Sequence, residues 1–401
     1  MAHSTPTRDW APWPVFGEDE ITAVTDVLTS GHTNYWTGPH GRAFEREYAE
    51  SVSCRHGVAV ANGTVALELA LEAIGIGEGD EVIVPCRSFL ASASAIVQRR
   101  AIPIFADVDR DSGNITVETI QSVLTPRSRG VLVVHLAGWP CNMAPIRDLA
   151  TSRGLAIIED CAQAHGARDR DQPVGSLGDI AAFSFCQDKI LSTGGEGGLV
   201  VTNDDRAWRR AWSFKDHGKD WDAVHAPSTG TVFRYVHGSL GTNWRLTEMQ
   251  SALGRILLGK LPGWISTRRN NAAVLQERLA AHPSLRIPIP PPSCQHSFYK
   301  FYAYLRPDRL HADWSRDRVA AEISAGGIPC GSGACPEIYL EAAFDQTPWR
   351  PTSRLPVAQE LGETSLMFQV HPGLDETHMH ACADFVTTVL DKATRRLARA
   401  A

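Results

Sequence analysis

The sequence has no long apolar run, no secretion signal and no excess of basic residues. No hydrophobic stretch approaches the roughly 20 residues that span a bilayer, so no membrane-spanning helix is predicted. The first ten residues lack the apolar segment of a signal peptide, and the nine scattered cysteines are therefore expected to be reduced thiols of a cytoplasmic protein. A net charge of −6 disfavours nucleic acid or an anionic membrane as the main partner.

Internal repeats, low-complexity segments and standard metal-binding spacings are also absent. Cys294, His296, Cys330 and Cys335 come nearest to a zinc site, but their spacing fits no standard pattern, so no metal is predicted. Without repeats, a chain of 401 residues that is 43% hydrophobic predicts a globular protein with a large core.

Short apolar runs alternate with helical stretches from about residue 18 to 255. Buried strands are expected over 81–85, 102–107, 131–136, 155–160, 181–185 and 198–202. Helices are expected between them over 64–74, 91–98, 144–152 and 205–214. This alternation indicates a mostly parallel sheet with helices on both faces, which places the chain in the α/β class.

The pattern changes after about residue 255. A long helix is expected over 250–281, kinked at Pro262, and a proline-rich break follows it. A strand over 299–305 and helices over 315–325 and 375–398 then predict a smaller α+β domain. The expected organisation is an N-terminal arm (1–17), a large α/β domain (18–255) and a small domain (256–401).

Lys189 follows the predicted strand 181–185 in a glycine-rich loop. A lysine at the carboxyl edge of a parallel sheet stands where open α/β folds bind ligands. By itself, the segment is explained better by an ordinary surface lysine beside a glycine turn. Two other segments reverse this preference, because each supplies a group that a phosphorylated heterocyclic cofactor requires.

The first such group is Asp160, at the end of the predicted strand 155–160. Its carboxylate can keep a pyridinium nitrogen protonated, although capping a helix is the simpler role. The second is Asn62-Gly63-Thr64, which precedes a helix whose free amides can bind a phosphate or be capped locally. Together with Lys189, these groups favour a lysine-bound pyridoxal 5′-phosphate (PLP).

Ordered motifs from about residue 16 to 389 match one known family. They include 36–38, 62–64, 79–83, 105–109, 134–136, 159–166, 175–179, the Lys189 loop, 217–218, 241–245 and 248–250. On these motifs the chain resembles the DegT/StrS family of PLP-dependent sugar aminotransferases. The resemblance implies the aspartate aminotransferase-type fold, known as fold type I.

The resemblance also implies roles for single residues. Lys189 would hold PLP as a Schiff base and later move a proton, and Asp160 would pair with the pyridine nitrogen. The other implied contacts are Gln163 to the phenolic oxygen, Gly63, Thr64 and Ser184 to the phosphate, Phe89 stacked on the ring, and Asn243 to the partner subunit's cofactor phosphate. This last contact implies a homodimer, and plain core packing is the alternative role of Phe89.

The chain departs from the family pattern at Arg87, at Gln187-Asp188 before the lysine, and over 365–372. Because these segments face the substrate side in the family, they leave the acceptor open. The expected reaction moves an amino group from L-glutamate, or glutamine, to a keto-sugar linked to a nucleotide, in amino-sugar biosynthesis. The alternatives are an aminocyclitol (keto-inositol type) aminotransferase, a PLP enzyme of another reaction type, and a non-catalytic PLP-binding regulatory protein.

Aromatic residues are concentrated near the N-terminus at Trp10, Trp13, Tyr35 and Trp36. They are expected either to pack at a dimer interface or to line the mouth of the substrate site. The sequence does not decide between these two roles.

Overall fold

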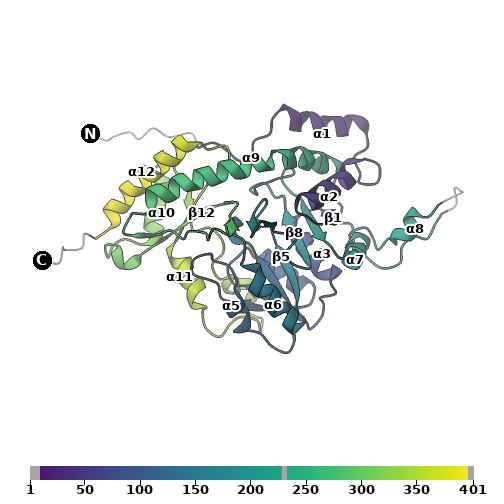
Figure 1. The fold of residues 1–401 in the computed structure, drawn as a ribbon, viewed down its shortest axis with the longest axis horizontal. Coiled ribbons are helices and arrows are strands. Elements are labelled where there is room, and N and C mark those ends of the chain that lie inside the picture. Colours follow the sequence, from purple (N-terminus) through teal and green to yellow (C-terminus); the bar gives the residue numbers. More distant parts are fainter. Residues whose placement is uncertain (1–9, 228–232, 396–401) are drawn as a thin grey trace.

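A seven-stranded sheet forms the centre of the computed structural model, which describes residues 10–227 and 233–395 (Figure 1). Its strands lie in the order β1-β9-β8-β5-β4-β2-β3. They are β1 (His56–Val60), β2 (Glu81–Pro85), β3 (Ile102–Ala106), β4 (Ser128–Val134), β5 (Ala156–Asp160), β8 (Ile180–Ser184) and β9 (Gly198–Thr202). Neighbours from β3 to β8 run parallel, whereas β9 is antiparallel to both β8 and β1.

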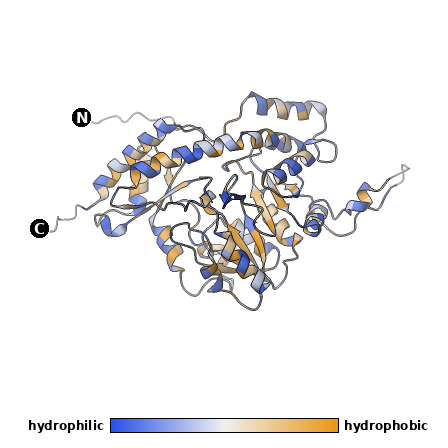
Figure 2. Ribbon diagram, viewed as in Figure 1, coloured by the Kyte–Doolittle hydropathy of each residue, from blue (hydrophilic) through white to orange (hydrophobic). Residues whose placement is uncertain are grey.

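The sheet is buried because most residues of its strands are apolar. Every residue of β2, β8 and β9 is buried, as expected for strands covered on both faces. Figure 2 shows the same strands coloured as hydrophobic at the centre of the molecule. The sequence predicted six of the seven strands and missed β1, which begins with the pair His-Gly.

Helices cover the sheet and connect its strands. They are α1 (Glu18–Ser30), α2 (His40–Ser51), α3 (Gly63–Ala73), α4 (Ala91–Gln98), α5 (Val117–Gln121), α6 (Met143–Arg153), α7 (Asp205–Lys215) and α8 (Trp221–His225). The expected helices at α3, α4, α6 and α7 are confirmed, with small shifts at their ends. Local capping explains where α3 begins, since the Asn62 side chain accepts a hydrogen bond from the Val65 N–H at 3.0 Å.

A 32-residue helix, α9 (Glu248–Leu279), links the two parts of the chain. It continues without a break through Pro262 and packs against α1 and α2 as well as against the C-terminal helix α12 (Glu376–Ala393). Figure 1 shows α9 running along one side of the molecule from α1 to α12. The domain boundary expected near residue 255 thus falls within one continuous helix.

A smaller antiparallel sheet follows α9, in the order β10-β12-β14-β13. Its strands are β10 (Leu285–Arg286), β12 (Phe301–Leu305), β13 (Cys330–Gly331) and β14 (Ser365–Phe368), with α10 (Arg316–Ala325), α11 (Pro356–Thr364) and α12 around it. A third sheet joins β6 (Arg168–Asp169), β7 (Gln172–Pro173) and β11 (Cys294–Gln295). The expected C-terminal helix ends earlier than predicted, and residues 396–398 of that prediction lie outside the described residues.

Within residues 10–227 and 233–395, none of the helices combines the length and the apolar character needed to cross a membrane.

Candidate active site

A cavity of about 530 Å³ opens at the carboxyl edge of the large sheet. The ends of β5 and β8, the start of α3 and the loop after β2 all border it, which is where open α/β folds place ligands. It brings together seven of the eight predicted site residues: Gly63, Thr64, Phe89, Asp160, Gln163, Ser184 and Lys189. These residues come from segments that are far apart in the chain.

Asp160, the last residue of β5, presents a buried carboxylate to this cavity. Oδ2 accepts a hydrogen bond of 2.8 Å from Ser92 Oγ, and Oδ1 accepts one of 3.1 Å from the Ala162 N–H. Burial raises the pKa of Asp160 above its ordinary value, although both hydrogen bonds and the Lys189 ammonium act in the opposite direction. A buried carboxylate whose pKa is raised by burial is stabilised in its ionised form by a cationic partner. Asp160 therefore suits the protonated nitrogen of a bound ring.

The N-terminus of α3 forms a second part of the cavity wall. Gly63 and Thr64 begin this helix, where backbone N–H groups have no partner within the helix and favour an anion. Gly63 lies so close to β8 that a Cβ in its place would be 2.5 Å from the Cβ of Ser184. A glycine is therefore required here, and the hydroxyls of Thr64 and Ser184 complete a set of groups suited to a phosphate.

A buried histidine holds the main chain of Ser184. His165 Nε2 lies 2.9 Å from the Ser184 carbonyl oxygen, and Nδ1 lies 2.6 Å from the Tyr48 hydroxyl. Because a carbonyl can only accept, Nε2 carries the hydrogen and Nδ1 accepts from Tyr48. Burial lowers the pKa of His165 to about 3, so the ring is neutral and supports the cavity wall rather than supplying charge.

Lys189 lies in the loop between β8 and β9 with its side chain 16% exposed. Its Nζ is 3.5 Å from Asp188 Oδ1, and the Tyr299 hydroxyl donates a hydrogen bond to the other oxygen of the same carboxylate. Burial acts to raise the pKa of Asp188, but the Lys189 ammonium and the Tyr299 hydroxyl outweigh it and lower that pKa. The ionised Asp188 thus holds the lysine amine beside the cavity.

Gln163 and Phe89 border the cavity in different ways. The Gln163 Oε1 accepts a hydrogen bond of 2.8 Å from the Ala137 N–H, which leaves its NH₂ group as the end available to a ligand. The Phe89 side chain is 67% exposed, so its interpretation as plain core packing is wrong. An exposed ring at a cavity mouth can instead cover one face of a planar ligand.

Asn243 does not lie on the cavity of its own chain. It is exposed and pairs through its main chain with Asp216, after the segment around α8 that projects from the large domain (Figure 1). The expected contact of Asn243 with a partner subunit's cofactor therefore stays a prediction.

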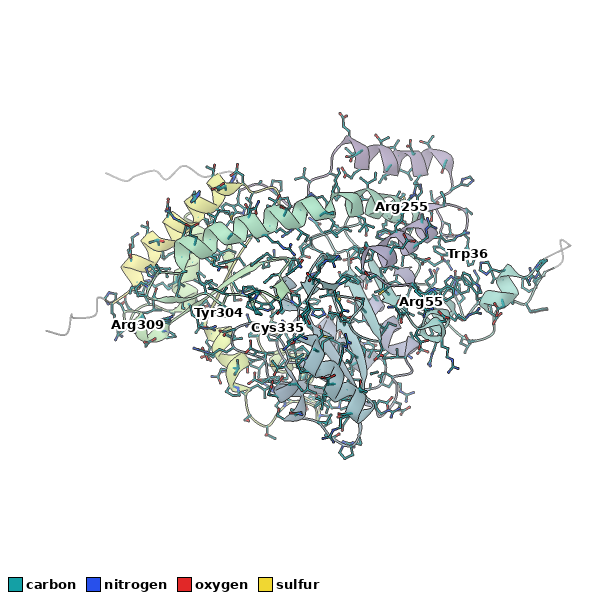
Figure 3. The ribbon with its side chains drawn as sticks, in the orientation of Figure 1. Trp36, Arg55, Arg255, Tyr304, Arg309 and Cys335 are labelled. Atoms are coloured by element: carbon teal, nitrogen blue, oxygen red, sulfur yellow. The ribbon has the colours of Figure 1, made fainter. Side chains whose placement is uncertain are left out.

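Arg87, a departure from the family pattern, is fully buried next to the small domain. Its Cζ lies 5.6 Å from the centroid of the Tyr302 ring, and none of its three side-chain nitrogens has a hydrogen-bond partner among the described residues. The next residue, Ser88, pairs with Cys335, which Figure 3 labels. Arg87 thus belongs to the junction between the two domains.

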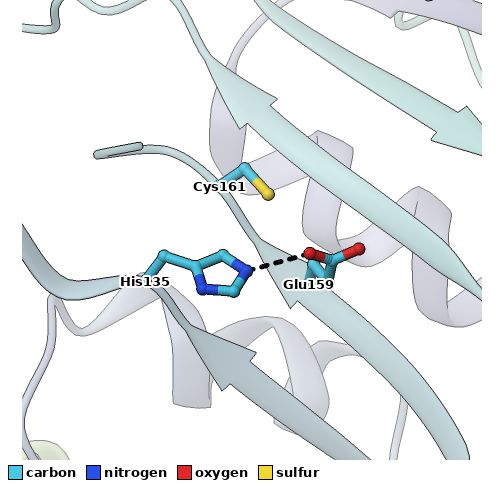
Figure 4. Close-up of side chains that lie close together, drawn as sticks. All are labelled: His135, Glu159 and Cys161. Atoms are coloured by element: carbon cyan, nitrogen blue, oxygen red, sulfur yellow. Dashed lines mark hydrogen bonds and ion pairs between the residues drawn. The ribbon is translucent and has the colours of Figure 1, made fainter. Parts of the chain in front are cut away.

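The described residues contain one group of three potential metal ligands: His135, Glu159 and Cys161 (Figure 4). The Cys141 N–H donates to His135 Nδ1 at 2.9 Å, so Nε2 carries the hydrogen that faces Glu159 Oε2, also at 2.9 Å. Burial raises the pKa of the Cys161 thiol, which keeps it protonated. With one imidazole nitrogen used by the backbone and no thiolate, the group is a closed hydrogen-bond network.

Several residues of the site were not found from the sequence. Ser92 holds Asp160, and Ser88 Oγ lies 2.9 Å from Ser92 Oγ. Ser88 precedes α4 and Ser92 lies in its first turn, so no helical spacing links the two serines in the sequence. Tyr299 is more than 100 positions from Asp188, and no local pattern connects them.

Comparisons with known proteins find aminotransferases over nearly the whole chain. The model of the DegT/DnrJ/EryC1/StrS aminotransferase family matches residues 14–387. A UDP-N-acetyl-3-dehydro-alpha-D-glucosamine 3-aminotransferase from Acidithiobacillus ferrooxidans is 35% identical over 97% of this chain and 96% of its own length. A dTDP-3-amino-3,4,6-trideoxy-alpha-D-glucose transaminase from Streptomyces venezuelae is 35% identical over 89% of both chains.

A solved aminotransferase from Psychrobacter cryohalolentis has the same architecture. It is 48% identical, with a TM-score of 0.94 over 96% of this chain and 99% of the other.

Proposed function

Since this chain belongs to the DegT/DnrJ/EryC1/StrS aminotransferase family, we propose that it transfers an amino group from L-glutamate to a nucleotide-linked keto-sugar. The family and the fold make it a PLP-dependent transaminase of fold type I. One observation carries the proposal for its site: Lys189, the buried Asp160 and the N-terminus of α3 share one cavity. The names of the two curated relatives support a nucleotide sugar as the acceptor.

The residues of the cavity fit PLP at each of its chemical groups. The α3 N-terminus, Thr64 and Ser184 suit the phosphate, and the buried Asp160 suits the ring nitrogen. When bound, PLP withdraws electrons from the α-carbon of the amino donor. Asp160 supports this withdrawal by favouring the positive charge at the ring nitrogen.

Lys189 has two tasks in this proposal. Its amine would first hold the cofactor covalently, and once an amino donor had displaced it, the free amine would take the proton from the donor's α-carbon and pass it to the cofactor carbon that carries the amine. Asp188 and Tyr299 keep the amine beside the cavity during both tasks. In the second half of the reaction, Lys189 returns a proton to the carbon of the keto-sugar that receives the amine.

Phe89 and Gln163 restrict how the ring lies. The exposed Phe89 ring covers one face of the bound heterocycle and excludes water from it, while the Gln163 NH₂ group donates to the phenolic oxygen. In this proposal Asn243 reaches the phosphate of the partner subunit's cofactor, so the active unit is a homodimer.

Borohydride reduction of the PLP-loaded protein, followed by peptide mapping, tests the role of the lysine. We expect the label on Lys189 and its loss in Lys189→Ala. Lys300→Ala is the matched control, because Lys300 also lies against the Tyr299 ring, with its Nζ 4.8 Å from the centroid. A label that persists in Lys189→Ala contradicts the assignment.

The substrates are tested with a panel of donors and acceptors followed by mass spectrometry. L-glutamate and L-glutamine are compared as donors, and UDP-linked and dTDP-linked 3-keto-sugars are compared with a keto-inositol as acceptors. We expect amine transfer to a nucleotide keto-sugar. Transfer only to the keto-inositol supports the aminocyclitol alternative, and loss of a group from the sugar without amine gain supports another reaction type.

A further inference from the structure

Trp13, in the N-terminal arm, contacts the main chain of the catalytic lysine. Its indole Nε1 donates a hydrogen bond of 2.9 Å to the carbonyl oxygen of Lys189. The two residues are 176 positions apart, so this contact exists only in the folded chain. A tryptophan that the sequence left between a dimer interface and a substrate mouth therefore lies against the Lys189 loop.

Three side chains from α9 and the small domain hold the Trp13 ring. Trp264 packs edge-on with ring centroids 5.0 Å apart, and His371 stacks on it at 5.7 Å with an interplanar angle of 23°. The guanidinium carbon of Arg268 lies 5.1 Å from the indole centroid. Two of these residues belong to α9 and the third follows β14, so the ring is fixed by the helix that links the domains and by the small domain.

The Lys189 loop has little regular structure of its own to fix the lysine. The Lys189 N–H donates to the Cys186 carbonyl at 3.0 Å, and the next two residues, Ile190 and Leu191, are fully buried. The hydrogen bond from Trp13 restrains the remaining polar group of the Lys189 main chain. Its loss removes a restraint on the peptide group that follows the Cα carrying the lysine side chain.

We propose that Trp13 is a positioning residue, which orients the Lys189 main chain so that its amine meets the reacting carbon in the cavity. The inference rests on the proposed function for its catalytic consequence, and on the 2.9 Å hydrogen bond from Trp13 to Lys189 for the contact itself. Through Trp264, Arg268 and His371, it also ties the orientation of the lysine to the placement of the small domain.

Trp10 offers a matched control in the same arm. Its indole Nε1 donates at 3.2 Å to Gln369 Oε1, and its ring packs edge-on against His378 at 6.0 Å. Trp10→Phe and Trp13→Phe thus each remove one indole hydrogen bond from the same segment. Only Trp13→Phe removes a bond to Lys189.

The first experiment compares the two variants as PLP-loaded enzymes. We expect Trp13→Phe to lower the rate constant for amine removal from L-glutamate about tenfold, the range expected when one hydrogen bond that orients the reacting lysine is lost. The KM for L-glutamate stays within about twofold. The midpoint of the pH titration of the lysine-bound cofactor's visible absorbance also moves in Trp13→Phe, whereas Trp10→Phe resembles the wild type in all three measurements.

A second measurement needs no bound cofactor. Amide hydrogen exchange over residues 186–193 is expected to be faster in Trp13→Phe than in the wild type, with Trp10→Phe unchanged. Equal exchange in both variants, or equal rates and titration midpoints, overturns the inference. A wild-type protein that does not act on L-glutamate overturns the proposed function instead, and the exchange measurement then still decides whether Trp13 orients the loop.

Discussion

Glu159 and Asp160 are consecutive carboxylates on β5, but they differ in the face of the sheet on which they lie and in their hydrogen-bond donors. Strand geometry directs them to opposite faces of the sheet. Glu159 lies in the closed network of Figure 4, where it accepts hydrogen bonds from His135 and from the N–H groups of Gly175, Leu177 and Gly178 at 2.7–3.0 Å. Asp160 faces the cavity and accepts only from Ser92 and the Ala162 N–H.

This difference separates a structural acid from a functional one. Four donors satisfy Glu159 completely, so it anchors the loop that leads into β8 and has no capacity left for a ligand. Asp160 has fewer donors and a pKa raised by burial, so its site is completed by a cation from outside the chain. Acidic residues on the two faces of one strand therefore differ: Glu159 serves stability, and Asp160 has the surroundings that the proposed catalysis requires.

The largest effect is expected for Asp160→Asn. Removing one partner of a buried ion pair should lower the rate of amine removal from L-glutamate on the order of 10³-fold, measured by single-turnover absorbance. Asp160→Glu, which keeps the charge, is the control and should retain more activity. A rate within tenfold of the wild type in Asp160→Asn would mean that the reaction does not depend on the Asp160 carboxylate, and that the two carboxylates do not differ in function.

The same substitution predicts a change in the pH dependence of stability without cofactor. Because the folded-state pKa of Asp160 lies above its ordinary value of 3.8, the cofactor-free protein loses stability as pH rises from that value through the raised pKa. Asp160→Asn should abolish this loss, as followed by urea unfolding across that range. A cofactor-free Asp160→Asn protein that is clearly less stable than the wild type near neutral pH would contradict the destabilisation of the ionised Asp160 by burial.

Glu159→Gln should lower the free energy of unfolding and leave the reaction rate nearly unchanged, the reverse of what is expected for Asp160→Asn. The new amide NH₂ faces backbone donors instead of accepting from them, which should cost about 3 kcal/mol of the free energy of unfolding. The folded fraction should keep its transamination rate within about twofold, since the Glu159 side chain is not among those that line the cavity. Denaturant unfolding and active-site titration separate the two quantities, and a large rate loss at unchanged stability would contradict the structural role.

Ser92→Ala is a smaller change that tests how Asp160 depends on its hydrogen-bond donor in the cavity. It removes the 2.8 Å hydrogen bond to Asp160 Oδ2, which should raise the pKa of Asp160 further and reduce the rate of amine removal about fivefold. Ser94→Ala on the same helix is the matched control and should leave the rate unchanged. Equal rates in the two variants would show that Asp160 does not depend on its serine donor.

The smallest effect is expected from removal of metal ions. Prolonged dialysis against a chelator should leave both the melting temperature and the activity unchanged, because the donors of the Glu159 network already bind one another. A fall in melting temperature that zinc restores would mean that the network of Figure 4 holds a metal.

Much of the fold followed from local patterns. The bounds of β2, β9 and α4 agree with the expected ranges, because apolar runs and helical periodicity are properties of short segments. The strand β1 escaped detection, although it is as long as β2 and β9, because a short apolar run does not by itself distinguish a strand from a helix. The exposure of Phe89 was also not decided by sequence, because an aromatic residue in a loop fits a core and a cavity mouth equally well.

By itself, the sequence determined the class of fold, the family and seven of the residues that meet at the cavity, because these depend on local patterns and on ordered motifs. Only the tertiary structure decided which neighbours each of them has. It separated Glu159 from Asp160 and brought Tyr299 to Asp188 and Trp13 to Lys189. The reason is physical: hydrogen bonds between residues more than 100 positions apart arise from the packing of whole elements and leave no pattern in either segment alone.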